Sequence, residues 1–513
     1  MRRAPDFCRL KQMEESIMLG YIRQEANRTY TENGALTNRS TGSDCLDLFS
    51  SIGALRRSNE NEIITRFERA YHEDPDLAMK ILFYARDIRG GLGERRVFRI
   101  ILRWLADNEP MSVMKNLENI AEYGRFDDLL SLMGTSCEKE MIEHIAMLFN
   151  EDLVRFEKGE SISLLAKWLP SVNASNGHTV RFAKKIAREF GMTEAGYRKA
   201  LTKMRARIRI IENNLREKDY SFDYEKQPSR ALFKYRKAFI RNDGKRYDRF
   251  LSLAGSGEAR LHADNIAPYE LIEPYLNYSW YGGGRSFMRK LDPEEEKALN
   301  VTWGSLPDFG GTGNALVVID TSGPMYCQWK PLPAAVALSL GLYFAERNRG
   351  PFGNHFIEFS ARPQLIEIKG ETFTDRLHYV ASFNEIADTN LESVFDLILN
   401  AAVRNNVKQE ELPERLIIIS DMEFNSCITN ASVTNYENAR RKYEDAGYKL
   451  PGIVFWNVAS RNRQVPVTTN DEGTILVSGA TPRLFQMVIE GVLSPYSFMM
   501  KTLNNRRYEG ITA

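Results

Sequence analysis

The sequence predicts a mostly α-helical region at residues 1–300, followed by an α/β domain at residues 301–513. Three observations predict this fold class. A chain of 513 residues is long for one hydrophobic core, so at least two units are expected. Residues 61–250 repeat apolar side chains at helical spacing, with short polar turns between them. From Ala315 onward, short apolar runs alternate with helical segments, which is typical of a doubly wound, Rossmann-like parallel sheet covered on both faces.

The overall composition is that of a folded protein. Hydrophobic residues make up 43% and charged residues 27% of the chain, so it can bury a sizeable core. No apolar run is long enough to cross a membrane, and the start of the chain lacks the apolar stretch of a signal peptide. The five cysteines are far apart and form no Cys-x-x-Cys pair. We therefore expect a cytoplasmic protein with free thiols and no membrane contact.

The charge is divided unevenly along the chain, although the net charge is only +1. Residues 161–250 contain 22 lysine and arginine residues against 9 aspartate and glutamate residues, a net charge of +13 that the rest of the chain offsets with −12. Such a basic surface suits an anionic polymer, because each neutralised phosphate releases a condensed counterion. The alternative is a solvated helical face that binds nothing. The charge pattern favours a nucleic-acid-binding surface.

Start signals and apolar periodicity locate individual helices in the N-terminal region. Asp74-Pro75 and Asp292-Pro293 each combine an N-cap residue with proline at the first helical position, where its missing N–H is not needed. The clearest helix is predicted over Thr193–Lys218, with one apolar face formed by Tyr197, Leu201, Met204, Ile208, Ile211 and Leu215. Two basic lines flank that face, one of Arg198, Arg205 and Arg209, the other of Lys199, Lys203 and Arg207. Successive helices of this kind favour an α-solenoid, although no clean sequence period establishes repeats.

Two segments of the helical region stand out by composition. Residues 84–96 form a glycine-rich turn with basic residues on both sides, but they lack the Lys-Ser/Thr ending of a P-loop and follow a helix instead of a strand. We therefore interpret them as a turn between helices. Trp168 lies in an apolar segment ahead of a basic helix, where it either packs in the core or stacks on a base. Both alternatives stay open for this tryptophan.

The α/β region divides into alternating strands and helices. Strands are predicted at Leu316–Asp320, His355–Ser360, Pro363–Ile368, Arg415–Ser420, Gly452–Val458 and Thr474–Val477, and helices at Leu332–Glu346, Leu391–Val403, Tyr436–Ala446 and Pro482–Glu490. Ligands of parallel sheets bind where the carboxyl ends of the strands meet. The side chains that follow these strands therefore form the candidate site.

Hard oxygen donors gather at those strand ends. Two carboxylates and two hydroxyls suit one Mg²⁺ ion whose other positions are filled by water. The sequence Asp-Thr-Ser-Gly also suggests an aspartic protease, but those enzymes are bilobal all-β proteins with two such motifs, and this chain has one in an α/β region. The sequence therefore predicts a magnesium site formed by Asp320, Ser322, Thr389 and Asp421.

Motifs along most of the chain carry a family resemblance. They are Glu32–Ala35, Ser40–Asp44, Ala85–Arg95, Leu165–Pro170, Lys234–Lys237 and Ser420–Glu423. Together with the strand pattern they resemble the TROVE/vWA family of the Ro autoantigen, above all a branch described only as a domain of unknown function, found in bacteria, viruses and some eukaryotes. By this resemblance the C-terminal region is a von Willebrand factor A-type (vWA) domain. Its metal-ion-dependent adhesion site has Pro324 where the family motif Asp-x-Ser-x-Ser has its second serine.

The resemblance implies a monomeric ring of HEAT-like helical repeats closed by the vWA domain. In Ro proteins, single-stranded RNA ends enter the ring, and small structured RNAs bind its basic outer surface. We therefore expect a non-catalytic RNA-binding protein with a role in RNA quality control. The expected RNA contacts are Arg86, Arg89, Lys167, Lys184, Lys185, Lys203, Arg205, Arg209, Lys234, Arg236 and Lys237.

Two other classes of function compete with RNA binding. A vWA domain can bind an acidic side chain of a partner through its metal ion, so a protein-interaction or assembly module, including a viral one, needs no RNA. An enzyme is the least supported class, because the sequence has no P-loop or nucleophile–base pair and its six histidines show no ligand spacing.

Overall fold

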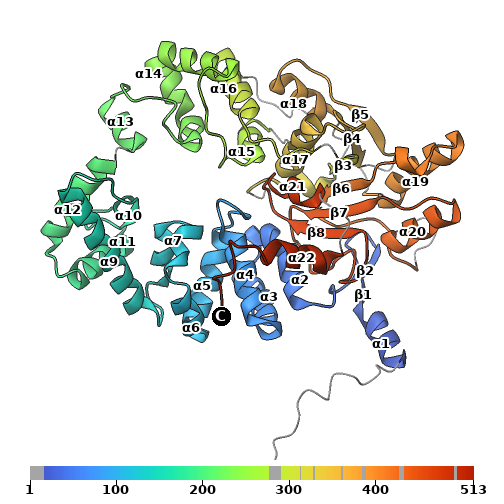
Figure 1. The fold of residues 1–513 in the computed structure, drawn as a ribbon, viewed down its shortest axis with the longest axis horizontal. Helices are drawn as coiled ribbons and strands as arrows, with labels where there is room; N and C mark the ends of the chain where they lie inside the picture. Colours follow the sequence, from blue (N-terminus) through green and yellow to red (C-terminus); the bar gives the residue numbers. More distant parts are fainter. Residues whose placement is uncertain are drawn as a thin grey trace, which may run out of the picture.

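The structure, a computed structural model, describes residues 17–208, 210–276, 291–311, 313–326, 330–359, 362–383, 389–426, 432–489 and 494–513. Its N-terminal region is mostly helical, as predicted, and forms an arc that starts and ends beside the sheet domain (Figure 1). The helices of this region are α1 (Ile17–Asn27), α2 (Asp44–Ser51), α3 (Glu60–Glu73), α4 (Pro75–Arg86), α5 (Arg96–Asn108), α6 (Pro110–Lys115), α7 (Asn119–Tyr123), α8 (Phe126–Leu129), α9 (Glu138–Glu157), α10 (Leu165–Trp168), α11 (Gly177–Glu189), α12 (Glu194–Ile208), α13 (Ile211–Glu217), α14 (Ser229–Ser256), α15 (Pro268–Ile272) and α16 (Pro293–Gly304).

Local sequence signals set some of these helix boundaries. The side chain of Asp74 accepts a hydrogen bond from the Leu77 N–H at 2.9 Å, and Pro75 is the first residue of α4, as the sequence predicts. The prediction of one helix over Thr193–Lys218 is wrong, because Ile210 has an extended backbone (φ −70°, ψ 143°) and separates α12 from α13. Neither proline nor glycine marks this break, so apolar periodicity alone extended the helix too far.

The glycine-rich turn joins α4 to α5 as a packed connection between helices. The Leu92 N–H donates to the Tyr84 carbonyl oxygen at 3.1 Å, and the Glu94 N–H donates to the Ala85 carbonyl oxygen at 2.6 Å. A Cβ atom at Gly91 would lie 2.0 Å from the Tyr84 carbonyl oxygen, so the backbone can approach this closely only with glycine. The interpretation of this segment as a turn between helices is confirmed.

The C-terminal region contains a six-stranded sheet with the order β5-β4-β3-β6-β7-β8. β5 is antiparallel to β4, and the other neighbouring pairs are parallel. The order reverses between β3 and β6, which is where ligands of doubly wound sheets bind. The elements are β3 (Ala315–Asp320), α17 (Pro333–Arg347), β4 (His355–Phe359), β5 (Gln364–Glu367), α18 (Phe373–Ser382), α19 (Leu391–Asn405), β6 (Arg415–Ser420), α20 (Asn435–Asp445), β7 (Gly452–Asn457), β8 (Thr474–Ser478), α21 (Leu484–Ile489) and α22 (Pro495–Leu503).

The central strands of this sheet bury side chains on both faces. In β3, Val317 and Ile319 pack into a core with α17, α21 and α22, whereas Leu316 and Val318 pack into a second core with α19 and α20. This two-sided burial explains why the strands are continuous apolar runs. The first core continues into the helical arc, so the arc and the sheet domain are joined by buried apolar contacts.

Both ends of the arc contact the sheet domain. At one end, the Gly53 N–H donates to Ser478 Oγ of β8 at 3.0 Å. At the other end, the Leu332 N–H, directly ahead of α17, donates to Glu273 Oε1 at 2.8 Å. These contacts close the arc into the ring of elements seen in Figure 1. HEAT-like repeat geometry within the arc stays a prediction.

Two further expectations concern cysteines and membranes. Cys45 and Cys137 are buried free thiols, whereas Cys8, Cys327 and Cys427 lie outside the described residues. Across the described ranges, no helix has the length and apolar character needed to cross a membrane.

Candidate functional site

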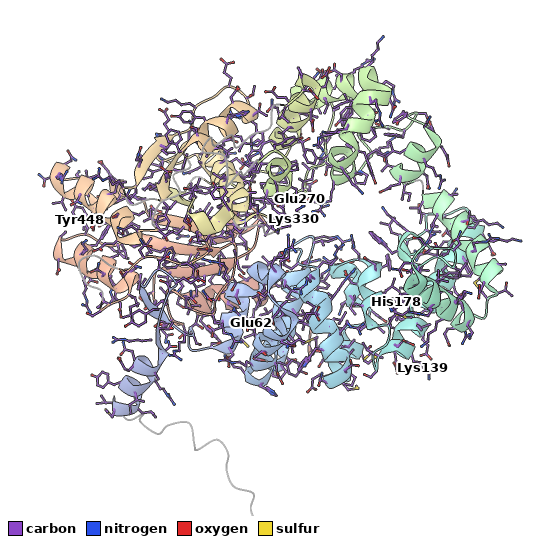
Figure 2. The ribbon with its side chains drawn as sticks, turned by 180° about the vertical axis from the view of Figure 1, so that it is seen from behind. Glu62, Lys139, His178, Glu270, Lys330 and Tyr448 are labelled. Carbon is purple, nitrogen blue, oxygen red and sulfur yellow. The ribbon has the colours of Figure 1, made fainter. Side chains whose placement is uncertain are left out.

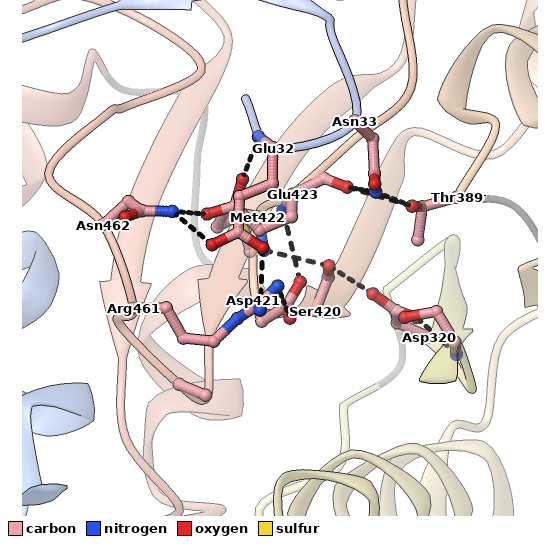
Figure 3. Close-up of polar contacts among 12 residues, drawn as sticks. Glu32, Asn33, Asp320, Thr389, Ser420, Asp421, Met422, Glu423, Arg461 and Asn462 are labelled. Atoms are coloured by element: carbon pink, nitrogen blue, oxygen red, sulfur yellow. Dashed lines mark hydrogen bonds and ion pairs between the residues drawn. The ribbon is translucent and has the colours of Figure 1, made fainter. Parts of the chain in front are cut away.

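The carboxyl ends of β3 and β6 bring two buried aspartates together. Asp320, the last residue of β3, accepts hydrogen bonds from the Ser322 N–H at 2.8 Å and from the Ser420 hydroxyl at 2.5 Å. Asp421, which directly follows β6, accepts a hydrogen bond from the Glu423 N–H at 3.2 Å. The exposed fractions of Asp320 and Asp421 are only 1% and 4%. Figure 3 shows Ser420 between the two aspartates.

The electrostatic surroundings of these aspartates favour a cation. Burial raises the pKa of Asp320, because its charged form loses hydration. Burial and the neighbouring charge of Asp320 raise the pKa of Asp421 to about 7, although the guanidinium of Arg461 acts in the opposite direction. Two buried carboxylates at one site repel each other, so a positive charge beside them stabilises the ionised pair.

Arg461 supplies one such positive charge. Its Nη2 atom lies 2.9 Å from Asp421 Oδ2, and its Nη1 atom lies 2.8 Å from Glu32 Oε2. The contact with Asp421 is an ion pair without hydrogen-bond alignment, so Asp421 Oδ2 is a buried oxygen that accepts no hydrogen bond from the described residues. The guanidinium therefore bridges an aspartate at the sheet to an acidic residue of the N-terminal segment.

That N-terminal segment reaches the site as a hairpin. β1 (Arg28–Tyr30) and β2 (Leu36–Asn38) are antiparallel, and the loop between them lies over the strand ends (Figure 3). Asn33 Nδ2 donates to Thr389 Oγ1 at 3.0 Å and to the Glu423 carbonyl oxygen at 2.5 Å. The hairpin loop is therefore a component of the site, although helices α2 to α16 separate it in sequence from the sheet domain.

The four predicted metal ligands lie at this edge of the sheet. Ser322 is buried beside Asp320. The Thr389 hydroxyl donates to the Glu423 carbonyl oxygen at 2.9 Å, which joins it to the segment after Asp421. Pro324 lies in a short 3-10 helix, Gly323–Tyr326, and has no side-chain oxygen to offer. The sequence reasoning did not include Arg461 or Glu32 in the site, because no local pattern relates either residue to the strand ends.

The donor set at the strand ends fits a hard cation such as Mg²⁺. Asp421 Oδ2 and Thr321 Oγ1 are buried oxygens without a hydrogen-bond partner in the described part of the chain. Leaving such oxygens unsatisfied is costly, and a metal ion would satisfy them. The described residues contain no group of three or more His, Cys, Asp or Glu side chains that could hold a metal. Hydroxyl groups and water would therefore have to complete the coordination of a bound ion.

Two of the predicted RNA contacts are buried in the helical arc. Arg86 forms an ion pair with Asp128 at 2.7 Å, and Arg236 forms one with Glu295 at 2.8 Å. Their exposed fractions are 2% and 8%, so neither guanidinium is available to a ligand at the surface. Their expected role is therefore corrected: both hold helices together, because a buried charge requires a partner. Arg209 lies outside the described residues.

Most of the other predicted RNA contacts are at the surface but already have a partner. Lys184, Lys185, Lys237 and Arg89 form ion pairs with Glu194, Glu138, Glu295 and Glu122, respectively. Lys167 and Lys234 lie 5.5 Å and 4.7 Å from the ring centroids of Trp168 and Tyr235. Trp168 is half-buried, and the Arg125 guanidinium lies 4.1 Å from its ring centroid. Exposed ion pairs are weak, so a phosphate can compete for the cations.

A basic pocket lies between α12 and the segment after α10. Its volume is about 520 Å³, and it is lined by Ser171, Val172, Asn173, Arg198, Lys199, Leu201, Thr202, Lys203 and Arg205. Arg205 donates hydrogen bonds to the carbonyl oxygens of Ala166 and Leu169 at 2.8 Å and 2.6 Å, so it fixes α12 to the α10 segment on one side of the pocket. Arg198, Lys199 and Lys203 are exposed and form no ion pair within the described ranges. Figure 2 shows His178 of the neighbouring helix α11 on the opposite side of the molecule from Tyr448 in the sheet domain.

Comparisons with known proteins give matches along most of the chain. Residues 314–502 match the family described as "Domain of unknown function (DUF7788)", and residues 31–152 and 191–308 match "Domain of unknown function (DUF2828)". The chain is 30% identical over 516 residues to "Uncharacterized protein L728" of Acanthamoeba polyphaga mimivirus, which covers 93% of this chain and 87% of that protein. A solved structure, "Crystal structure of Deinococcus radiodurans RO (RSR) protein", is similar with a TM-score of 0.33 and 12% identity, covering 87% of this chain and 93% of that chain.

Proposed function

This chain belongs to the family of the mimivirus protein L728, and we propose that it is a non-catalytic RNA-binding protein that holds single-stranded ends or small structured RNA on the basic surface of its helical arc. The single observation that carries this proposal is the basic pocket beside α12. The pocket lies within residues 161–250, the segment with a net charge of +13.

The chemistry of the pocket suits a nucleotide. Arg198, Lys199 and Lys203 supply exposed positive charge for phosphates, and a phosphate does not have to displace an acidic partner from them. Ser171 and Asn173 add a hydroxyl and an amide, which suit sugar and base edges. The volume of about 520 Å³ falls within the range of roughly 300–1,000 Å³ that is typical of small-ligand sites.

The sequence resemblance to Ro proteins supports a finer version of this proposal. On that basis the arc is a monomeric ring of HEAT-like repeats, and the sheet domain that closes it is a vWA domain. The protein then acts in the cytoplasm in RNA quality control, without catalysing a reaction itself.

Fluorescence anisotropy with a labelled single-stranded RNA tests the proposal. The double variant Lys199→Glu/Lys203→Glu should bind at least about tenfold more weakly than the parent at low salt, because two phosphate contacts are lost. Lys408→Glu/Lys449→Glu is the matched control, since both lysines are exposed on the sheet domain and the charge change is the same. The control should stay within about twofold of the parent. A parent protein that binds no RNA at low salt would contradict the proposal.

A second candidate function is protein interaction through the strand-end site. The observation that favours it is that this site already holds an acidic loop of the chain itself, with Glu32 beside Arg461. We propose that Asp320, Ser322, Thr389 and Asp421 would hold a magnesium ion there. Such an ion would supply a positive charge for an acidic side chain of a partner. Asp320→Ala removes one of the proposed magnesium ligands. If this variant still binds RNA, the strand-end site is not required for RNA binding, and the two candidate functions belong to separate sites.

A further inference from the structure

The hairpin loop and Arg461 occupy the same strand-end site that the proposed magnesium ion would use. We propose that Glu32 and Arg461 form an internal occupant of this site, which a divalent cation has to displace before it binds Asp421. This inference rests on the proposed magnesium site and assigns the regulation of that site to two residues of the chain.

Glu32 is held at the site through both its backbone and its side chain. Its N–H donates to Glu423 Oε2 at 2.8 Å. Its carboxylate lies 2.8 Å from Arg461 Nη1 and accepts a hydrogen bond from Asn462 Nδ2 at 2.9 Å. Asn462 Nδ2 also donates to Glu423 Oε1 at 2.8 Å, which ties the two acidic residues together (Figure 3). The carboxylate of Glu32 is therefore positioned as a bound acidic ligand would be.

Arg461 stands where a cation is needed between two carboxylates. The guanidinium contacts Glu32 on one side and the buried Asp421 on the other, at 2.8 Å and 2.9 Å. A metal ion that binds an acidic ligand joins a protein carboxylate to the ligand carboxylate in the same way. Here the guanidinium of Arg461 joins the carboxylates of Glu32 and Asp421, and it carries one positive charge where a divalent cation carries two.

The closed loop and a bound cation exclude each other. Thr389 Oγ1 accepts a hydrogen bond from Asn33 and donates one to the Glu423 carbonyl oxygen, so the hairpin loop already occupies one of the two acceptor positions of this hydroxyl. A cation on Asp421 Oδ2 would lie next to the guanidinium, which would repel it. Metal binding therefore requires Arg461 to leave, and its departure removes the main partner of Glu32.

The ion pair between Glu32 and Arg461 is exposed enough to dissociate. The side chains of Glu32 and Arg461 keep exposed fractions of 47% and 18%, whereas that of Asp421 has only 2%. Partly exposed ion pairs are weak because water competes for both charges. The exposed half of the bridge can therefore release while the buried aspartate stays in place.

Calorimetric titration of the full chain with MgCl₂ tests the proposal. Arg461→Gln should bind Mg²⁺ at least about tenfold more tightly than the parent, because the competing charge is gone. Glu32→Gln should shift affinity in the same direction, since it releases Arg461. The matched control is Arg463→Gln, which removes an arginine two positions away that pairs with Glu62 instead. This control should leave the affinity unchanged.

The Mg²⁺ titrations distinguish the proposed role of Glu32 and Arg461 from the existence of the magnesium site itself. Equal Mg²⁺ affinity in the parent and Arg461→Gln would overturn the inference while the magnesium site stands. Absence of binding in every variant would overturn both. Neither result bears on RNA binding at the basic pocket.

Hydrogen exchange of the hairpin loop gives a second readout that needs no variant. The Glu32 N–H is hydrogen-bonded to Glu423 Oε2 and is protected while the loop is closed. At Mg²⁺ concentrations that saturate the site, exchange of this amide should become at least about tenfold faster than in KCl of equal ionic strength. Bound Mg²⁺ with unchanged protection of Glu32 would overturn the proposal.

Discussion

Arg507 and Asp87, 420 positions apart in the sequence, form a bidentate ion pair that fastens the C-terminal segment to the helical arc. Arg507 Nη2 donates to Asp87 Oδ1 at 2.7 Å, and Arg507 Nε donates to the other carboxylate oxygen. The Tyr508 hydroxyl donates to Asp87 Oδ2 at 3.1 Å. The Asp87 side chain is fully buried, so its charge depends on these partners.

Replacing Arg507 should therefore destabilise the fold. Arg507→Gln leaves the charge of Asp87 buried without its main partner and should lower the free energy of unfolding by roughly 2–3 kcal/mol, less than for a fully buried pair because Arg507 is partly exposed. The measurement is the urea midpoint. The adjacent Arg506 is exposed and forms no ion pair in the described part of the chain, so Arg506→Gln is the matched control and should leave the midpoint unchanged. Equal midpoints for the two variants would contradict this role of the pair.

The same pair predicts a dependence of stability on pH. Burial by itself would raise the pKa of Asp87, but hydrogen bonds from Arg507 and from the Arg89 N–H outweigh it and hold the pKa below its usual value. A carboxyl group whose folded-state pKa is depressed contributes stability above its unfolded pKa and loses it as the pH falls through the folded pKa. Without Arg507, burial raises the pKa of Asp87, so the variant takes up a proton at Asp87 at a higher pH than the parent does. The difference in urea midpoint between the parent and Arg507→Gln should therefore be largest at neutral pH and shrink as the pH falls. A difference that persists undiminished at about pH 3 would refute this assignment.

The contact between the arc and the sheet domain depends on a glycine. A Cβ atom at Gly53 would lie 2.5 Å from the Ser478 carbonyl oxygen, so Gly53→Ala must push β8 away from the arc. We expect a loss of roughly 1–3 kcal/mol in the free energy of unfolding, measured by urea denaturation. Gly304→Ala is the control, because nothing lies within 4 Å of the added atom. An unchanged midpoint in Gly53→Ala would show that this contact is not needed.

Lysines without an acidic partner should contribute more to RNA binding than paired ones. Lys184 and Lys185 have to leave Glu194 and Glu138 before they contact phosphate, whereas Lys199 and Lys203 do not. Log affinity should fall linearly with log salt, with a slope near −0.7 for each neutralised phosphate of a single strand. Lys199→Glu/Lys203→Glu should therefore make this slope shallower than Lys184→Glu/Lys185→Glu does. Anisotropy across a salt series measures both slopes, and the reverse order would place the RNA elsewhere on the arc.

The sheet domain could be predicted because its signals are local. The strand predicted at Arg415–Ser420 contains the continuous apolar run Leu416–Ile419, and the structure has β6 at the same residues. Parallel strands end at the same edge, so the meeting of Asp320 and Asp421 also follows from the sequence. The break at Ile210 could not be predicted, because no helix-breaking residue marks it.

The rest of the site depends on tertiary contacts that no local pattern contains. Glu32 and Glu423 are 391 positions apart in the sequence. Their hydrogen bond forms only because the fold of the helical arc places the sheet domain beside the hairpin. A count of charged residues likewise could not show that Arg86 is buried while most lysines of the basic segment are exposed. Its guanidinium is buried against Asp128, and burial is a property of the packed helices.

Ultraviolet crosslinking of the full chain to a single-stranded RNA, followed by mass spectrometry of the crosslinked peptides, tests the central claim most directly. The RNA should crosslink to peptides from residues 165–208, which form the basic pocket and the helices around it. Crosslinks confined to the sheet domain at residues 315–489, or none at all, would contradict RNA binding by the helical arc.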